Sequence, residues 1–280
     1  MIDVIIPAYN CSKTLFKTLS SLETQTDNDF NVIIVDDCST EDLTEIIDQK
    51  RTNLHITYIC KEKNEGCGMA RQTGIDNATS EYITFLDADD ILMPYAVETF
   101  NAMIASNDFD IYHSYFYEQT RINEAPAIRL HKDGFTWCHG KLYKLDFIKK
   151  NNIHNSPEVK YADDSFFNSM CTELGTLSVI PLGMYIWMNN SDSITRNIDS
   201  SFKKDSLSDF INAMIKSTKF VLQHKPLSEI QHLPNTIENI RISYARLYAG
   251  LSKEEKEHTD NLIEEFSKMI GKDIMKNETE

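Results

Sequence analysis

Residues 82–91 of this chain read Tyr82-Ile83-Thr84-Phe85-Leu86-Asp87-Ala88-Asp89-Asp90-Ile91. The first four residues form an apolar run that is typical of a buried strand. Carboxylates that leave the end of a buried strand together repel one another unless a cation neutralises them, so the cluster suggests a divalent metal ion. Aspartates are also common in turns and at helix N-caps, and Pro94 suits the first turn of a helix. The cluster alone leaves both interpretations open, and Asp90 is the residue expected to cap the following helix.

Two earlier apolar runs also end in polar residues. Residues 2–6 form a predicted buried strand that is followed by Pro7-Ala8-Tyr9-Asn10. Residues 30–35 form a second strand, which is followed by Asp36-Asp37. Apolar residues at helical spacing follow each strand, and this β-α-β-α order predicts an α/β fold with a parallel sheet whose strands end at one shared, ligand-binding edge. The residues expected to converge at that edge are Tyr9, Asp37, Asp87 and Asp89.

The composition is that of an ordinary globular protein, with 280 residues, 41% of them hydrophobic and 25% charged. The formal net charge of -15 argues against a protein that holds nucleic acid mainly through phosphate contacts. Met1 leads into the first strand without a cationic, apolar leader, and no apolar stretch has membrane-spanning length, so we expect a cytoplasmic protein. The six cysteines show no paired C-x-x-C spacing, which indicates reduced thiols and no zinc site.

The position of the glycines narrows the nucleotide chemistry. The first glycine in the chain is Gly66, so the first strand-helix turn contains neither a G-x-G-x-x-G dinucleotide loop nor a G-x-x-x-x-G-K phosphate loop. A bound nucleotide would then be held by side chains and a metal ion. That combination points to sugar nucleotides.

Several ordered blocks of this chain resemble glycosyltransferase family 2, of the GT-A fold and the inverting, bacterial polysaccharide type. The blocks are residues 4–10, 32–39, 64–71 and 82–90, followed by 137–143, which is similar to an acceptor-side segment, and 161–167, which is similar to an acidic base motif. The resemblance covers about residues 1 to 196, and the chain departs from the family pattern at Cys38 and Gln72. It implies a Rossmann-like, nucleotide-sugar-binding GT-A domain over residues 1–198. After that point apolar residues recur at helical spacing with charged residues between them, which predicts a C-terminal helical extension over residues 199–280.

The resemblance also implies a donor site for a UDP-sugar. Asp37 should accept a hydrogen bond from the imide N–H of uracil, and a carboxylate facing that group gives a strong, charge-assisted bond. Pro7 and Tyr9 should line the base and ribose, with Asn10 and Asp36 beside them. Helix capping is the alternative for one aspartate of the Asp36-Asp37 pair.

A divalent ion, Mn²⁺ or Mg²⁺, is implied between the donor phosphates and the Asp-x-Asp cluster. Asp89 is the implied metal ligand, and Asp87 orients the ribose and the metal ion, as hard oxygen ligands shared with phosphates suit these ions. Arg71 should hold the carboxylates or the diphosphate in place. Its structural alternative is an exposed arginine on a helix.

The acceptor side is implied by two later segments. Asp164 should be the general base that takes the proton from the acceptor hydroxyl, and Asp163 should orient the acceptor. A capping pair at the start of a helix is the alternative for both. Trp137, His139 and Lys141 could form part of an acceptor platform, although a tryptophan at a strand end is as often part of the core. Residues 189–196 are similar to a loop that closes over the donor in relatives.

The expected activity is hexosyl transfer, class EC 2.4, from a nucleotide sugar to a glycan, lipid-linked or other hydroxyl acceptor. Nucleic acid is not an expected partner, apart from a modified base as acceptor. A sugar-phosphate nucleotidyltransferase is the alternative enzyme, but it calls for a glycine-rich basic loop where this chain has residues 7–10. A non-catalytic binding or assembly module is the third hypothesis. The helical extension could pair subunits or help bind the acceptor. The donor sugar, the acceptor and the linkage stay open.

Overall fold

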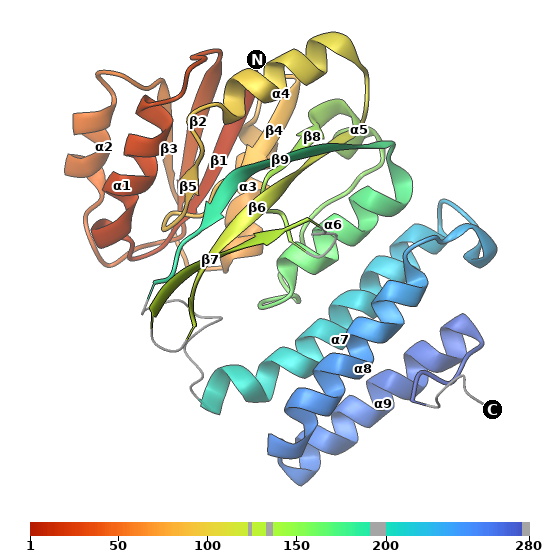
Figure 1. The fold of residues 1–280 in the computed structure, drawn as a ribbon. Coiled ribbons are helices and arrows are strands. Elements are labelled where there is room, and N and C mark those ends of the chain that lie inside the picture. Colours follow the sequence, from red (N-terminus) through yellow and green to blue (C-terminus); the bar gives the residue numbers. More distant parts are fainter. Residues whose placement is uncertain (123–124, 133–136, 191–199, 276–280) are drawn as a thin grey trace. The chain divides into compact units, whose positions relative to one another are not determined.

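The computed structural model describes residues 1–122, 125–132, 137–190 and 200–275 (Figure 1). The chain divides into two compact units, the first formed by residues 1–157 and 175–190, and the second by residues 158–174 and 191–280. The second unit therefore contains the helices expected after residue 198 and also an earlier segment, residues 158–174. The domain boundary at residue 198 stays a prediction.

The first unit is an α/β structure, as predicted. Its elements in chain order are β1 (Ile2–Ala8), α1 (Ser12–Glu23), β2 (Phe30–Asp36), α2 (Thr44–Lys50), β3 (Ile56–Cys60), α3 (Cys67–Asn77), β4 (Tyr82–Phe85), β5 (Ile91–Leu92), α4 (Ala96–Ser106), β6 (Ile111–Ile122), β7 (Ala125–His131), β8 (Lys141–Lys144), α5 (Leu145–Lys150) and β9 (Leu177–Trp187). The second unit contains α6 (Asp163–Leu174), α7 (Ser200–Leu222), α8 (Leu233–Leu247) and α9 (Lys253–Ile270), with short 3₁₀ turns at Leu227–Glu229 and Tyr248–Gly250.

The sheet of the first unit is parallel in one half and mixed in the other. Its strand order is β3-β2-β1-β4-β8-β6-β9-β5, with β7 paired to β6. The first four strands are parallel, as the sequence predicts, whereas β8 runs antiparallel to both β4 and β6. This antiparallel strand brings the segment before residue 141 alongside the end of β4.

Both faces of the parallel half are covered, which explains why its strands consist mostly of apolar residues. Every residue of β1 is buried. Val4 belongs to a core that includes Leu19 of α1 and Phe100 of α4, while Ile5 faces α3 on the other side. At that contact a Cβ added to Gly74 would lie 2.3 Å from Cγ2 of Ile5, so only glycine lets α3 approach the sheet this closely.

The start of the sheet is anchored by a buried carboxylate, Asp3. It accepts hydrogen bonds from the backbone N–H groups of Thr79 at 2.7 Å and Ser80 at 2.9 Å, and from the side chains of Ser80 and Asn31. Burial raises the pKa of Asp3, but these hydrogen bonds outweigh it and leave the pKa below its ordinary value. Asp3 therefore stabilises the fold in its ionised form.

We expect Asp3→Asn to lower the free energy of unfolding at pH 7 by about 1–3 kcal/mol, since it places an amide N–H₂ among buried N–H donors. Because the pKa of the folded state is lowered, the stabilisation is present above the unfolded pKa and is lost as pH falls through the folded value. The gap between wild type and variant should therefore narrow in acid. Urea unfolding at pH 7 and at about pH 3 measures it. Asp48→Asn, at an exposed carboxylate paired with Arg51, should change little at either pH, and an equal gap at both pH values would contradict the assignment.

Candidate functional site

The Asp-rich turn begins where β4 ends. The N–H of Leu86 continues the sheet by donating to Ile5, and the N–H of Asp90 closes the turn by donating to the carbonyl of Asp87 at 3.0 Å. The chain then enters β5, which pairs with β9 rather than with its own neighbours in sequence. The turn is thus fixed between the parallel half of the sheet and the end of β9.

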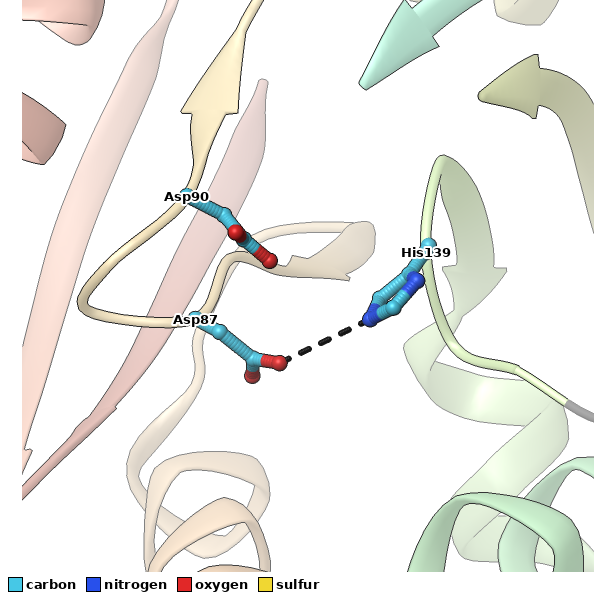
Figure 2. Close-up of side chains that lie close together, drawn as sticks. All are labelled: Asp87, Asp90 and His139. Carbon is cyan, nitrogen blue, oxygen red and sulfur yellow. Dashed lines mark ion pairs between the residues drawn. The ribbon is translucent and has the colours of Figure 1, made fainter. Parts of the chain in front are cut away.

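Asp87 is held by an arginine and a histidine from other elements. Nη2 of Arg71, on α3, lies 2.7 Å from Oδ1 of Asp87, and Nε2 of His139 lies 3.6 Å from Oδ2 (Figure 2). Burial raises the pKa of Asp87, but the charge of Arg71 and the interaction with His139 outweigh it and hold the pKa well below its usual range. These partners therefore favour the ionised form of Asp87. The side chain of Arg71 is 5% exposed, so the arginine is a buried partner of Asp87 and not an exposed helix residue.

His139 lies in an aromatic pocket. Its ring stacks on Tyr185 with centroids 4.6 Å apart, faces Trp137 at 5.7 Å and meets the edge of Phe116 at 5.3 Å. The residue is 4% exposed, and its buried Nδ1 has no hydrogen-bond partner among the described residues. A ring packed in this way is fixed in orientation, with Nε2 directed at Asp87.

Asp90 does not cap the following helix, so that prediction is wrong. Its carboxylate accepts from the hydroxyl of Tyr185 at 2.5 Å and from the backbone N–H of Met188 at 2.7 Å. The reason is the pairing of β5 with β9, which turns this side chain toward β9, while α4 starts only at Ala96. Burial and the charges of Asp87 and Asp89 raise the pKa of Asp90 well above its ordinary value.

A compact set of possible metal ligands results from this arrangement. Asp87, Asp90 and His139 each offer one ligand atom, and these atoms lie within 4.8 Å of one another (Figure 2). Asp89 lies beside this set: its Oδ2 accepts from Nδ2 of Asn190 at 3.3 Å, and burial together with the charge of Asp87 raises its pKa. The sequence names Asp87 and Asp89 for the metal ion and misses His139 as a ligand candidate. The sequence signal for His139 is weak: it is a histidine two residues before β8, and only the structure shows that β8 pairs with β4.

The nucleoside-side candidates lie at the ends of β1 and β2. Ala8 pairs with Asp36 in the sheet, so Tyr9 and Asp37 follow neighbouring strand ends, and Tyr9 is 49% exposed. Pro7 is the last but one residue of the buried strand β1. Asn10 has a positive φ of 47° and accepts from the N–H of Thr40 at 2.8 Å, which ties this loop to the one after β2.

The two neighbouring aspartates bind different loops. Asp36 accepts from the N–H of Ser39 at 2.8 Å and from the hydroxyl of Tyr58 at 2.7 Å. Asp37 accepts from Nζ of Lys61 at 2.6 Å and from the backbone N–H of Gly66 at 2.6 Å. In this structure Asp37 therefore holds the loop between β3 and α3, and its contact with a nucleobase stays a prediction.

The acceptor-side candidates fall in two places. Trp137 is half-buried beside His139 and Trp187. Asp163 and Asp164 occupy the first turn of α6 in the second unit, where Asp163 is buried and Asp164 is half-buried. Of the predicted loop 189–196, residues 191–196 lie outside the described residues. No helix within the described part of the chain combines the length and the apolar character needed to cross a membrane.

A comparison with protein families matches the chain to one family model. The model described as "Glycosyl transferase family 2" matches residues 3–159. Among curated proteins, the chain is 26% identical over 216 residues to "Uncharacterized glycosyltransferase EpsJ" of Bacillus subtilis, covering 70% of this chain and 63% of that protein. It is 29% identical over 178 residues to the poly(ribitol-phosphate) beta-N-acetylglucosaminyltransferase TarS of Staphylococcus aureus, covering 59% of this chain and 31% of TarS. The chain thus spans less than two thirds of the length of these relatives.

Solved structures confirm the fold. The crystal structure of S. aureus TarS 1-349 in complex with UDP-GlcNAc matches with a TM-score of 0.73 at 19% identity, covering 96% of this chain and 81% of that one. The mannosyltransferase PcManGT of Pyrobaculum calidifontis, in complex with GDP-Man and Mn²⁺, matches with a TM-score of 0.59 at 14% identity, covering 95% and 75% of the two chains. The mixed α/β sheet with C-terminal helices is therefore a GT-A-like fold.

Proposed function

The chain belongs to glycosyltransferase family 2, and we propose that it is a metal-dependent, inverting glycosyltransferase that moves a sugar from a UDP-sugar to an acceptor hydroxyl. One observation carries the proposal. At the ligand-binding edge of the sheet, Asp87 is ionised, paired with Arg71, and grouped with Asp90 and His139 in a compact set of oxygen and nitrogen donors. A diphosphate and its counter-ion are the ligands that such a set suits.

The donor chemistry of this set fits a divalent ion. Carboxylates suit Mg²⁺ and Mn²⁺ alike, but an imidazole favours a first-row transition ion over magnesium, so we propose Mn²⁺ as the preferred metal. Asp87 and His139 would hold it, with Asp89 as the ligand named by the family pattern. Each carboxylate oxygen of Asp90 accepts one protein hydrogen bond and keeps a further lone pair for coordination. A bound ion supplies Lewis-acid stabilisation of the charge that develops on the departing diphosphate.

The nucleotide would lie across the ends of β1 and β2. The half-exposed ring of Tyr9 can pack on a base or ribose, and Pro7, Asn10 and the Asp36-Asp37 pair shape the surrounding loops. The name of TarS and its complex with UDP-GlcNAc make UDP-GlcNAc the first donor to test.

Transfer would need one base and no covalent enzyme intermediate. Asp164 takes the proton of the acceptor hydroxyl while the oxygen of that hydroxyl attacks the anomeric carbon of the donor sugar. The bond from the anomeric carbon to the diphosphate oxygen breaks on the opposite side. The configuration of the sugar is inverted because a single displacement occurs. Trp137 is the residue proposed to contact the acceptor, and Asp163 and His139, which are both buried, are proposed to orient it.

The test is a panel of donors with water as the acceptor. We expect Mn²⁺ to support slow release of UDP from one or two of UDP-GlcNAc, UDP-Glc and UDP-Gal, and EDTA to abolish it. Release of pyrophosphate from UTP with a sugar 1-phosphate should be absent, because the loop after β1 lacks the basic, glycine-rich sequence of a nucleotidyltransferase. A folded protein that neither hydrolyses nor binds any nucleotide sugar would contradict the proposal.

The role of His139 can be tested by metal affinity alone. We expect His139→Ala to weaken Mn²⁺ binding in the presence of UDP by about tenfold or more, because the site loses its nitrogen donor. Electron paramagnetic resonance of free Mn²⁺ measures the change. The matched control is His131→Ala, because His131 stacks on the same Phe116 ring but pairs with Glu118. An unchanged Mn²⁺ affinity in folded His139→Ala would remove this residue from the metal site.

A further inference from the structure

The start of helix α6 is stabilised by a residue that is distant in sequence. The residue before the helix is Ala162, which has no side-chain oxygen to cap it. The carboxylate of Asp209, on α7, accepts instead from the backbone N–H groups just before the helix: Tyr161 at 2.7 Å, Ala162 at 3.0 Å and Lys160 at 3.0 Å. Three successive N–H groups therefore converge on one carboxylate, 47 to 49 residues away in sequence.

The other end of α6 is held in a similar way. Glu173, near its last turn, accepts from Nζ of Lys225 at 2.6 Å and from the backbone N–H of His232 at 2.6 Å. Lys225 and His232 lie between α7 and α8. Both ends of α6 are thus bonded to the C-terminal part of the chain, beyond the residues matched by the family model. Phe167, Met170 and Cys171 of α6 are buried as well.

This arrangement places a carboxylate anchor two residues from the candidate base. A charge-assisted hydrogen bond is about twice as strong as a neutral one, and here three donors share one acceptor group, so the backbone leading into Asp163 and Asp164 has little freedom. A displacement of a catalytic group by about 1 Å can lower a rate on the order of a hundredfold. We therefore expect the hydrogen bonds of Asp209 to affect the reaction rate more than the free energy of unfolding.

We propose that Asp209 is a positioning residue for Asp164, and that α7 acts in catalysis by fixing the first turn of α6. This inference rests on the proposed function, because it takes Asp164 to be the general base. It assigns a task to the C-terminal helices that their own sequence does not reveal: through Asp209, α7 holds the backbone that leads into α6.

The test compares Asp209→Ala and Asp209→Asn with Asp205→Ala, an exposed carboxylate one turn earlier on the same helix. With the donor that is active in the panel, we expect Asp209→Ala to lower kcat by about tenfold or more. The donor KM and the affinity for Mn²⁺ and UDP should stay within about twofold of wild type, because a displaced base slows the chemical step without altering ground-state binding. Asp209→Asn keeps one acceptor oxygen, so its kcat should lie between that of wild type and that of Asp209→Ala. Hydrogen exchange of residues 158–166 should accelerate in Asp209→Ala and not in Asp205→Ala.

Each outcome separates this inference from the proposed function. If Asp209→Ala leaves kcat unchanged while Asp164→Asn abolishes turnover, the positioning role is overturned and the proposed function stands. If Asp164→Asn itself keeps full turnover, the base assignment fails and takes this inference with it. Should Asp209→Ala not fold, Asp209→Asn decides: a lowered kcat at constant donor KM supports the positioning role, and a kcat equal to that of wild type overturns it.

Discussion

Asp164→Asn should abolish sugar transfer and leave donor binding intact. The substitution keeps the shape of the side chain and removes its ability to accept a proton, and general-base catalysis contributes roughly 10²- to 10⁴-fold to such a step. The decrease should appear in kcat, because the acceptor hydroxyl must be deprotonated as it attacks. In the proposed mechanism UDP and Mn²⁺ are bound by the carboxylates of the first unit, so their affinities should not change. UDP release under saturating donor measures kcat, and titration calorimetry with UDP and Mn²⁺ measures binding.

The neighbouring carboxylate provides the matched comparison. Asp163 occupies the same helical turn and is buried, whereas Asp164 is half-buried and so better placed to meet a substrate. Asp163→Asn should therefore lower turnover less than Asp164→Asn does. If Asp164→Asn lost donor binding and kept its turnover, or if Asp163→Asn were the more damaging change, Asp164 would not be the base.

The parallel half of the fold could be predicted because its strands are buried on both faces. Residues 2–6 and 30–35 are predicted strands, and the structure extends them only to Ala8 and Asp36. Residues 82–85 form a strand with the predicted bounds. A short apolar run rich in Val and Ile that ends in turn residues fits a strand inside a covered sheet, so the local sequence is sufficient there.

The mixed half could not be predicted, because its pairings join residues far apart in sequence. Most residues of β7, which pairs with β6, are exposed, so the strand lacks the alternating or apolar pattern that would distinguish it from a loop. Asp90 binds Tyr185 and Met188, which lie 95 and 98 residues away, and no local sequence pattern predicts these contacts. His139 meets Asp87 because β8 runs antiparallel to β4, a pairing that the β-α alternation does not imply. The candidate ligands that local sequence can name are therefore those at the ends of the parallel strands.

Asp89→Ala should remove metal-dependent turnover, and a comparison with Asp87→Asn should identify the ligand that matters most. Metal-ion stabilisation of a leaving group amounts to several kcal/mol, so loss of the metal ion should lower kcat by roughly 10³-fold. Asp87→Asn should have at least as large an effect, because it also leaves the buried guanidinium of Arg71 without its anionic partner. The measurements are UDP release and Mn²⁺ affinity for both variants, with thermal unfolding as the check that each is folded.

The matched control is Asn190→Ala, which removes the donor to Asp89 and leaves every carboxylate in place. It should keep its Mn²⁺ affinity, because a hydrogen bond of 3.3 Å is a weak competitor for a carboxylate oxygen that binds a divalent ion. If Asp89→Ala retained wild-type Mn²⁺ affinity while His139→Ala and Asp87→Asn lost it, the ion would be held by the set of Asp87, Asp90 and His139, and Asp89 would act through the substrate alone. If none of these variants changed the dependence on Mn²⁺, the acidic turn would have a structural role, and the proposed metal-dependent mechanism would be wrong.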